Sequence, residues 1–172
     1  MSILRHPWRR IAAWLIDCAL ILLWAGLLAA IGVPLYRAGI IGDPPLALAN
    51  LVAALVLVVP AVLVLAALDA GPKAATIGKR IMGLRLTDVA GARVTYARAA
   101  LRNALKLGLP WLIAHAAVYG LWEGSPTDAI PTWVWPLLAV AYAIPIVWLA
   151  SIFVRVGRSP YDQLTRTVVV DA

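Results

Sequence analysis

The ionisable residues with the clearest potential for chemistry lie inside apolar stretches of the sequence. Asp17 follows the start of the first apolar stretch, at Ile11, by six residues, which places it about 9 Å along a helix that starts there. An aspartate at the centre of a membrane span costs about 2.5–3.5 kcal/mol on insertion scales, and less nearer the edge. Such a residue either binds an ion or proton or fixes helix packing through a buried ion pair. The second interpretation is slightly favoured, because buried ion pairs in small bundles often serve only assembly.

Arg10 is the expected partner of Asp17. It lies seven residues earlier, two helical turns away on nearly the same face. Its long side chain can lean inward toward the carboxylate, directly or through a bridging group. The pair therefore predicts either an ion or proton site or a structural ion pair.

Asp69 and His115 are weaker candidates. Asp69 ends the second apolar stretch, just before Gly71 and Pro72, and we expect it at a solvated helix end. His115 lies in the middle of the third stretch, and histidine can shuttle protons near neutral pH. A single histidine without a partner visible in the sequence is more often a packing residue.

The sequence lacks the motifs of the common catalytic and metal sites. It contains no P-loop, no GxSxG, no HExxH and no paired metal ligands, so we expect no enzymatic activity, no metal site and no cofactor. Its single cysteine, Cys18, excludes an intramolecular disulfide and a multi-cysteine zinc site. Nucleic-acid binding is not expected either, because anionic lipid headgroups beside the basic segments explain the net charge of +7 more simply.

The bulk composition assigns the chain to the membrane class. Of its 172 residues 63% are apolar, and the mean hydropathy is +0.90, whereas soluble domains are about 45–50% apolar. About 20 residues of helix cross a hydrocarbon core about 30 Å thick. Four stretches meet or approach that length: about 11–31, 46–68, 105–122 and 133–154. The third is marginal, because Lys106, Pro110 and His115 interrupt it.

The basic residues support all four spans. With four spans, fourteen of the fifteen lysines and arginines lie on one face of the membrane, and Arg37 lies on the other. The positive-inside rule makes the richly basic face cytoplasmic. We therefore expect a multi-pass protein of the bacterial inner (plasma) membrane with both termini in the cytoplasm. A cleaved signal peptide is disfavoured, because Asp17 falls inside its would-be apolar region.

The segment between the second and third spans, about 71–98, is more than a linker. Residues 82–88 and 93–96 alternate apolar and polar side chains on either side of a turn-forming stretch at 89–92. This pattern predicts a short β-hairpin at the cytoplasmic membrane surface.

The hairpin is expected to connect with its neighbours. Thr95 is a candidate N-cap for an amphipathic helix over 96–106 that leads into the third span. The tail, 155–172, contains the β-branched run 167–170, and we expect it to pair with the hairpin as a further strand. The expected fold is an all-α membrane protein with a single domain over 1–172, a four-transmembrane-helix bundle that carries this small cytoplasmic β-structure.

Three segments together resemble the RDD family of bacterial membrane proteins, which is named for one arginine and two aspartates. They are Arg9–Asp17 (RRIAAWLID), Thr76–Asp88 (TIGKRIMGLRLTD) and Tyr161–Val170 (YDQLTRTVVV). Each segment alone is only moderately specific, whereas their order and surroundings extend the resemblance over nearly the whole chain. The resemblance implies that the family arginine is Arg10 and that the two aspartates are Asp17 and Asp162, with Arg9 as a rival for the arginine.

The tail departs slightly from the family pattern. Members often have Ala-Gly before the Thr-Val-Val run, where this chain has Thr165 and Arg166. The resemblance therefore does not decide whether the tail forms the tight turn of the family. The molecular function of the family is largely unassigned, and the resemblance implies a transport role because some members are described as cation/proton antiporters. We expect Asp162 and Arg10 at the same depth, where they can pair across the bundle while Asp17 lies deeper.

Two functions remain as hypotheses. The first is transport of ions or small solutes, such as cation/proton antiport, in which Asp17 binds the cation or proton and Arg10 competes with the cation. The second is a non-transporting scaffold or accessory protein that binds a partner or anionic lipid headgroups through its basic cytoplasmic face. The expected partners are the lipid bilayer and either further copies of the chain or another membrane protein, because four short helices enclose little volume.

Overall fold

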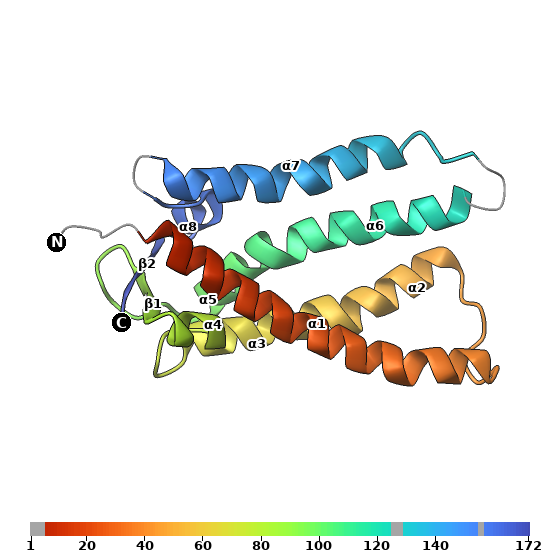
Figure 1. Cartoon of the computed structure of the whole chain (residues 1–172), viewed down its shortest axis with the longest axis horizontal. Helices are drawn as coiled ribbons and strands as arrows, with labels where there is room; N and C mark the ends of the chain where they lie inside the picture. The colour runs from red at the N-terminus through yellow and green to blue at the C-terminus, as the bar shows by residue number, and fades with distance from the viewer. Residues whose placement is uncertain (1–5, 125–128, 155–156) are drawn as a thin grey trace.

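Four long helices dominate the computed structural model, which describes residues 6–124, 129–154 and 157–172 (Figure 1). The second and third are each built from three consecutive segments, the middle one π-helical. In chain order the segments are α1 (Pro7–Arg37); α2 (Leu46–Ala53), η1 (Ala54–Val58) and α3 (Val59–Ala70); α5 (Tyr96–Asn103), η2 (Ala104–Gly108) and α6 (Leu109–Gly124); and α7 (Val134–Phe153).

All four predicted spans are confirmed as helices long and apolar enough to cross a membrane. The helical stretches that qualify within the described residues are Pro7–Arg37, Ala47–Ala70, Tyr96–Trp122 and Val134–Phe153. The third, which was marginal from position 105, gains length because the amphipathic stretch before it continues without a break from Tyr96. Thr95 is the N-cap as predicted, since its hydroxyl accepts a hydrogen bond from the backbone N–H of Arg98 at 3.4 Å.

The π-helical segments lie just before prolines in the second and third spans. η1 ends two residues before Pro60, and η2 ends two residues before Pro110. Proline has no N–H, so Pro60 leaves the carbonyl of Val56, four residues earlier, without its helical donor. The indole N–H of Trp24 donates to that carbonyl at 3.2 Å, which ties α1 to the second span.

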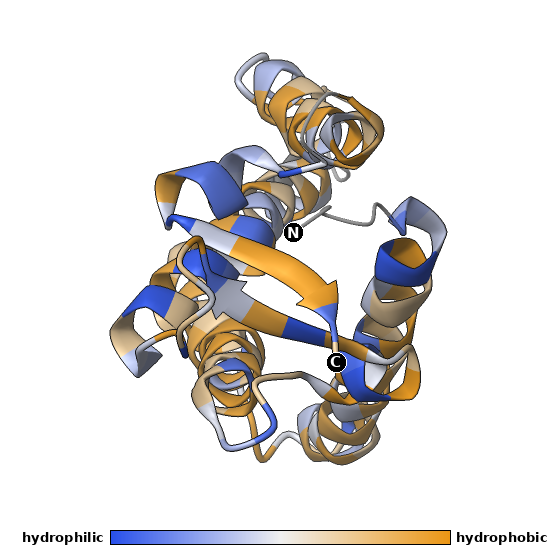
Figure 2. Ribbon diagram, turned by 90° about the vertical axis from the view of Figure 1, so that its left-hand side faces the viewer, coloured by the Kyte–Doolittle hydropathy of each residue, from blue (hydrophilic) through white to orange (hydrophobic). Residues whose placement is uncertain are grey.

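A small cap covers one end of the bundle, with two strands lying across it (Figure 2). Its elements are α4 (Ile77–Ile81), β1 (Leu84–Asp88), α8 (Pro160–Leu164) and β2 (Thr167–Asp171). The strands are antiparallel, with Leu86 opposite Val169. We call this the sheet end of the molecule. The start of α1 and the C-terminal strand both lie there (Figure 1).

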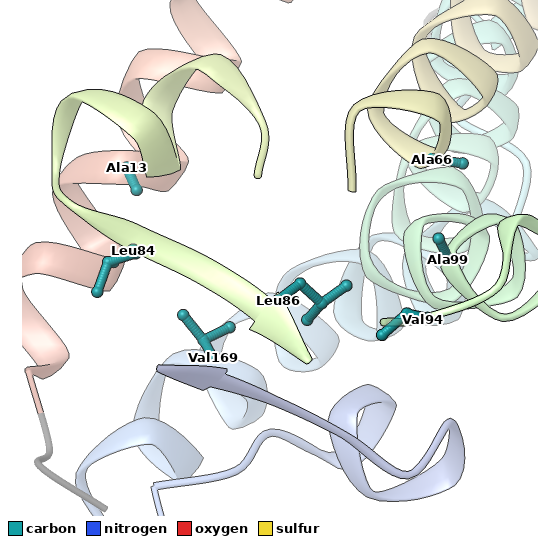
Figure 3. Packing of buried hydrophobic residues seen from close by; sticks show 7 residues of the cluster. All are labelled: Ala13, Ala66, Leu84, Leu86, Val94, Ala99 and Val169. Carbon is teal, nitrogen blue, oxygen red and sulfur yellow. The ribbon is translucent and has the colours of Figure 1, made fainter. Parts of the chain in front are cut away.

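The cap is held to the bundle by an apolar cluster at the sheet end (Figure 3). Alternate strand residues supply one side of it, which is the pattern expected of a sheet with one buried face. The ends of α1, α3 and α5 and the turn before α5 supply the other. The buried members are Ala13, Ala66, Leu84, Leu86, Val94, Ala99 and Val169. The cap therefore packs directly against the ends of the spans.

The predicted hairpin is wrong in its second strand. β1 forms, but residues 93–95 are not a strand, and the tail strand β2 pairs with β1 in their place, as expected for the tail. The cause lies in the turn. The carboxylate of Asp88 accepts hydrogen bonds from the N–H groups of Ala90 and Ala92, both at 2.8 Å. The next residues lead directly to Thr95, the N-cap residue of α5, so no stretch remains that could lie beside β1 as a strand.

Two pairs of long helices pack closely in the bundle, whereas α1 packs mainly against the cap. α3 packs against α5, α6 against α7, and α1 against α4 of the cap. α1 and α7 meet at the sheet end, where the ring of Trp8 packs edge-on against Phe153 with centroids 5.4 Å apart. Deeper in the bundle, Ile21 of α1 joins an apolar cluster with Val58, Leu65 and Leu107.

Candidate functional site

Asp162 is the centre of a buried charge cluster at the sheet end. It lies in the first turn of α8, and its side chain is fully buried. One oxygen accepts from Nη2 of Arg10 at 2.7 Å, and the other accepts from Nε and Nη2 of Arg102 at 2.8 and 2.7 Å. The expected pairing of Arg10 with Asp162 is therefore present, and it links the start of α1 to the segment after α7.

Asp69, at the end of α3, is the second buried carboxylate of the cluster. It forms an ion pair with Nζ of Lys79, accepts from Nδ2 of Asn103 at 3.1 Å and lies 3.5 Å from Nη1 of Arg102. The prediction of a solvated helix end is wrong. The chain folds back after Gly71 through a turn that returns the N–H of Ala75 to the second span, and α4 then brings Lys79 over Asp69.

Arg102 connects Asp162 with Asp69, and its role was not predicted from the sequence. Its side chain is 2% exposed, bridges Asp162 and Asp69, and lies over the ring of Tyr161 at 5.1 Å. The available signal was the spacing in the amphipathic helix. Lys106 follows Arg102 by four residues and Asn103 by three, and such a polar stripe at the mouth of a span faces protein more readily than lipid.

Attraction between opposite charges controls the protonation of Asp162. Burial by itself would raise the pKa of this carboxyl, but the guanidinium groups of Arg102 and Arg10 outweigh it and hold the pKa below its ordinary value. Asp162 is therefore an anion near neutral pH. The opposite balance holds at Lys79, where burial lowers the pKa of the ammonium group and Asp69 offsets only part of this effect. This lysine holds its proton less firmly than an exposed one.

Asp17 has different partners from the one expected. Its two oxygens accept hydrogen bonds from the hydroxyl of Thr76 at 2.7 Å and from the N–H of Gly78 at 2.8 Å. The guanidinium group of Arg10 turns instead toward Asp162 and the carbonyl of Gly157, so the predicted lean toward Asp17 is wrong. The sequence of α1 alone does not show the competing partners. Asp162, from the other side of the bundle, lies within reach of Arg10, and Thr76 and Gly78 donate to Asp17.

The contact between α1 and α4 depends on a residue without a side chain. A Cβ on Gly78 would lie 2.0 Å from the carbonyl oxygen of Ala13 and 2.9 Å from the carboxylate of Asp17. Both positions are closer than a carbon atom can approach. Gly78 therefore allows the backbone of α4 to touch α1, and Asp17 fastens it there.

The other two predicted residues lie outside the cluster. Nη1 of Arg9 pairs with Asp171 at 2.7 Å, and its Nε donates to the carbonyl of Met82 at 2.9 Å, so Arg9 holds the ends of the two strands. His115 lies on α6 and stacks between Trp111 and Tyr119, each with centroids 6.3 Å away. It lines no part of the cavity described next, which agrees with a packing role.

A cavity of about 210 Å³ lies beside the cluster, between α1 and α7. Its polar wall contains Asp17 and the basic residues Arg10, Lys79, Arg102 and Lys106. Its apolar wall is formed chiefly by Trp14 of α1 and by Ile146, Trp148, Leu149 and Ile152 of α7. Within the described ranges, no three histidine, cysteine or acidic side chains come together as metal ligands.

Lys106 is the distinctive group of this cavity. It lies in η2 within the third span and is half-buried. Among the residues with described positions, none forms a hydrogen bond or an ion pair with its ammonium group. Asp17 lines the same void as Lys106, together with the cationic side chains of Lys79 and Arg102. The cavity thus combines a carboxylate with a cation that has no direct partner among the described residues, both inside the membrane-spanning part of the chain.

Comparison with known proteins agrees with the resemblance in the sequence. A scan against protein-family models matches the RDD family over residues 4–166. Searches of curated proteins and of solved structures find no match. The matched range contains Arg10, Asp17 and Asp162 and extends over nearly the whole chain, so this membrane protein belongs to the RDD family.

Proposed function

We propose that this protein transports ions or small solutes and that the cavity between α1 and α7 is its binding site. The observation that carries the proposal is the cavity itself, in which Asp17 and Lys106 line one void within the spans. A network of structural ion pairs needs no empty space, whereas a transport site needs a void that a substrate can enter. Ionisable residues inside spans commonly mark such pathways.

The charges support a specific form of transport, cation/proton antiport. In the described part of the chain, the cluster and the cavity together hold four basic and three acidic side chains: Arg10, Lys79, Arg102 and Lys106 against Asp17, Asp69 and Asp162. The site therefore carries one positive charge in excess. In one state this excess charge is the proton on Lys106. In the other state Lys106 has released its proton, and a monovalent cation bound near Asp17 takes the place of that charge.

Lys106 takes the competing role that the sequence assigned to Arg10. The guanidinium group of Arg10 is engaged by Asp162 and by the carbonyl of Gly157, and an arginine does not release its proton at physiological pH. Lys106 has no direct partner among the described residues, and a lysine, unlike an arginine, can release its proton in a protein site. Cation entry and proton release are therefore coupled through repulsion within the cavity.

We also propose that the protein lies in the plasma membrane with the sheet end in the cytoplasm. The described basic residues gather in and around the cap, and Arg37 lies at the opposite end of α1. The positive-inside rule makes the basic end cytoplasmic. The cavity would then lie close to the cytoplasmic face, and the transport pathway would be completed by further copies of the chain or by another membrane protein.

A non-transporting scaffold is the second candidate, and the bonding of Asp17 favours it. Both oxygens of this carboxylate already accept hydrogen bonds from the loop, so its role would be to fasten α4 to α1. Under this alternative the basic cap would bind a partner protein or anionic lipid headgroups, and the cavity would have no part in the function.

A flux measurement separates the two candidates. The full chain is reconstituted in liposomes that contain a pH-sensitive dye, and proton movement is followed after addition of Na⁺, K⁺ or Li⁺. Transport predicts cation-driven flux by the wild type, and a loss of about tenfold or more in Asp17→Asn and Lys106→Met. Arg85→Met is the matched control, because it removes one positive charge from the exposed face of β1, and it should keep the wild-type rate.

The folded state of each variant is checked by thermal unfolding in detergent. Flux lost in a well-folded Asp17→Asn protein supports the transport site. Wild-type protein that is folded and correctly oriented, yet moves no protons with any of the three cations, would contradict antiport. An Asp17→Asn variant that loses stability and abundance while wild-type flux is absent would favour the scaffold.

A further inference from the structure

We propose that the cavity also binds a single-chain anionic amphiphile, such as a fatty-acid carboxylate, which enters from the bilayer between α1 and α7. Its carboxylate lies against Lys106 and Arg102, and its chain lies along the apolar wall. This site goes beyond transport of ions, and its existence does not depend on whether the protein transports them.

The apolar wall opens onto the surface that faces lipid. Trp14, Ile146 and Leu149 line the cavity, yet 39%, 63% and 44% of their surfaces remain exposed on the isolated chain. Each of these residues borders the cavity and also presents surface to the outside of the chain, so the opening is placed between them. Since these residues belong to spans, the opening lies at the level of the acyl chains. A hydrocarbon chain can therefore pass into the cavity without contact with water.

The polar wall contains donors that an anion would satisfy. Lys106 has no direct partner within the described residues. Arg102 is 1% exposed, and its Nη1 has no hydrogen-bond partner among them although it lies 3.5 Å from Asp69. A buried donor without an acceptor is costly, and native structures rarely leave one without a reason. An incoming carboxylate provides an acceptor for these groups and a counter-charge for the excess positive charge of the site.

The acidic groups around the site do not prevent this binding. Asp17 lines the cavity, but Thr76 and Gly78 already donate to its oxygens. Asp69 and Asp162 are paired with Lys79, Arg10 and Arg102. The charge that an anion meets at the polar wall is therefore the ammonium group of Lys106.

The size of the cavity favours one chain over two. Its volume of about 210 Å³ lies below the roughly 300–1,000 Å³ of pockets for drug-sized ligands. This space suits a small headgroup and the first part of one chain, with the rest of the chain extending between α1 and α7 into the bilayer. A two-chain phospholipid would have to leave most of its bulk outside.

Binding of two matched amphiphiles to the full chain in non-ionic detergent tests the inference. Native mass spectrometry would measure dodecanoate and dodecanol, which have the same chain and differ in the charged headgroup. We expect dodecanoate to bind about tenfold more tightly than dodecanol, as a charged hydrogen bond implies. Lys106→Met should remove that preference and leave dodecanol binding unchanged, which also shows that the variant is folded. Arg85→Met should change neither affinity.

A second variant tests the route of the chain. Ile146→Trp narrows the opening and should weaken both amphiphiles, whereas a site on the surface of the cap would not respond. Equal affinity of the wild type for the two amphiphiles, or equal dodecanoate binding by the wild type and Lys106→Met, would overturn the inference. Cation-driven flux without any dodecanoate binding would defeat this inference alone, and dodecanoate binding without flux would defeat only the transport proposal.

Discussion

Arg102 is the side chain that contacts both Asp162 and Asp69, the two buried carboxylates of the cluster. Its guanidinium group contacts Asp162 at 2.7 Å, Asp69 at 3.5 Å and the ring of Tyr161 at 5.1 Å from the centroid. Asp162 and Tyr161 belong to α8 and Asp69 belongs to α3, so this side chain of α5 connects three elements of the chain. Removing it would leave two buried carboxylates with fewer counter-charges, which is much more costly than removing an exposed charge.

Replacement of Arg102 by methionine should destabilise the protein by about 3–5 kcal/mol, the range for breaking one side of a buried ion pair. Unfolding in mixed detergent–SDS micelles, followed by tryptophan fluorescence, would measure the loss. Arg85→Met should change stability by only about 0.5 kcal/mol or less, because its side chain is exposed. Equal losses in the two variants would contradict the bridging role of Arg102.

Acid should weaken the protein through Asp162. Arg102 and Arg10 overcome the effect of burial and hold the pKa of this carboxyl below its unfolded value of 3.8. A carboxyl whose pKa is lower in the folded state contributes stability that is fully present above the unfolded pKa and disappears as pH falls through the folded pKa. The melting temperature in detergent should therefore fall on acidification below about pH 4.

The variant Asp162→Asn isolates this contribution. It should melt at a lower temperature than the wild type near neutral pH, because Arg10 and Arg102 lose an anionic partner. Its melting temperature should then depend less on pH below about 4 than that of the wild type. If the two acid profiles run parallel, Asp162 does not account for the sensitivity to acid.

At the scale of elements, the short helix α4 decides how the cap meets the spans. It follows Thr76, whose hydroxyl donates to Asp17 of α1, and its Lys79 reaches Asp69 of α3. A helix of five residues has little stability of its own, because helix formation needs a costly nucleus. Its contacts with two spans hold it in place, and the family segment Thr76–Asp88 thus acts as a clamp between α1 and α3.

Gly78→Ala tests the clamp. The added carbon would lie 2.0 Å from the carbonyl oxygen of Ala13, and backbone cannot yield as a flexible side chain can. Forcing α4 away should cost about 1–3 kcal/mol, the usual range for overpacking, measured as a lower midpoint of thermal unfolding. Gly26→Ala is the matched control within a span, where the new carbon would meet nothing within 4 Å. A loss no greater than that of the control would show that α1 and α4 are not in close contact.

At the scale of the whole molecule, the chain separates a charged end from an apolar body. The cap and the adjoining ends of the spans hold the ion pairs, while exposed apolar side chains such as Leu23, Ile31 and Val64 cover the rest of the helices. Only a bilayer can surround such a body without a large cost. The cavity lies where the two regions meet, so charged and apolar ligand groups can both reach it.

Single cysteines in a Cys18→Ala background would test the orientation of this molecule. Arg85→Cys places a thiol on the cap, and Ile40→Cys places one at the exposed turn at the opposite end. With the cap in the cytoplasm, a membrane-impermeant maleimide should label Ile40→Cys in intact cells and Arg85→Cys only after the membrane is opened. The reverse pattern would contradict the proposed orientation.

Contiguous features of the sequence predicted the spans, whereas contacts between distant segments decided the site. Apolar length, the placement of basic residues and an N-cap signal are local properties of the sequence. The four helices and the N-cap residue of α5, Thr95, could therefore be predicted. The pair of Arg10 and Asp162 followed from the family resemblance together with expected depth. The partners of Asp17 and Asp69 could not be predicted, because Thr76, Gly78 and Lys79 reach them only when the loop folds back.

The central claim is that cation entry into the cavity is coupled to loss of a proton from Lys106, and proton release on cation binding tests it most directly. Purified protein in weakly buffered detergent solution would be titrated with Na⁺, K⁺ or Li⁺ while a pH indicator reports released protons. The account predicts release of about one proton per bound cation by the wild type, and none by Lys106→Met. Cation binding without proton release, or equal release from the wild type and Lys106→Met, would contradict it.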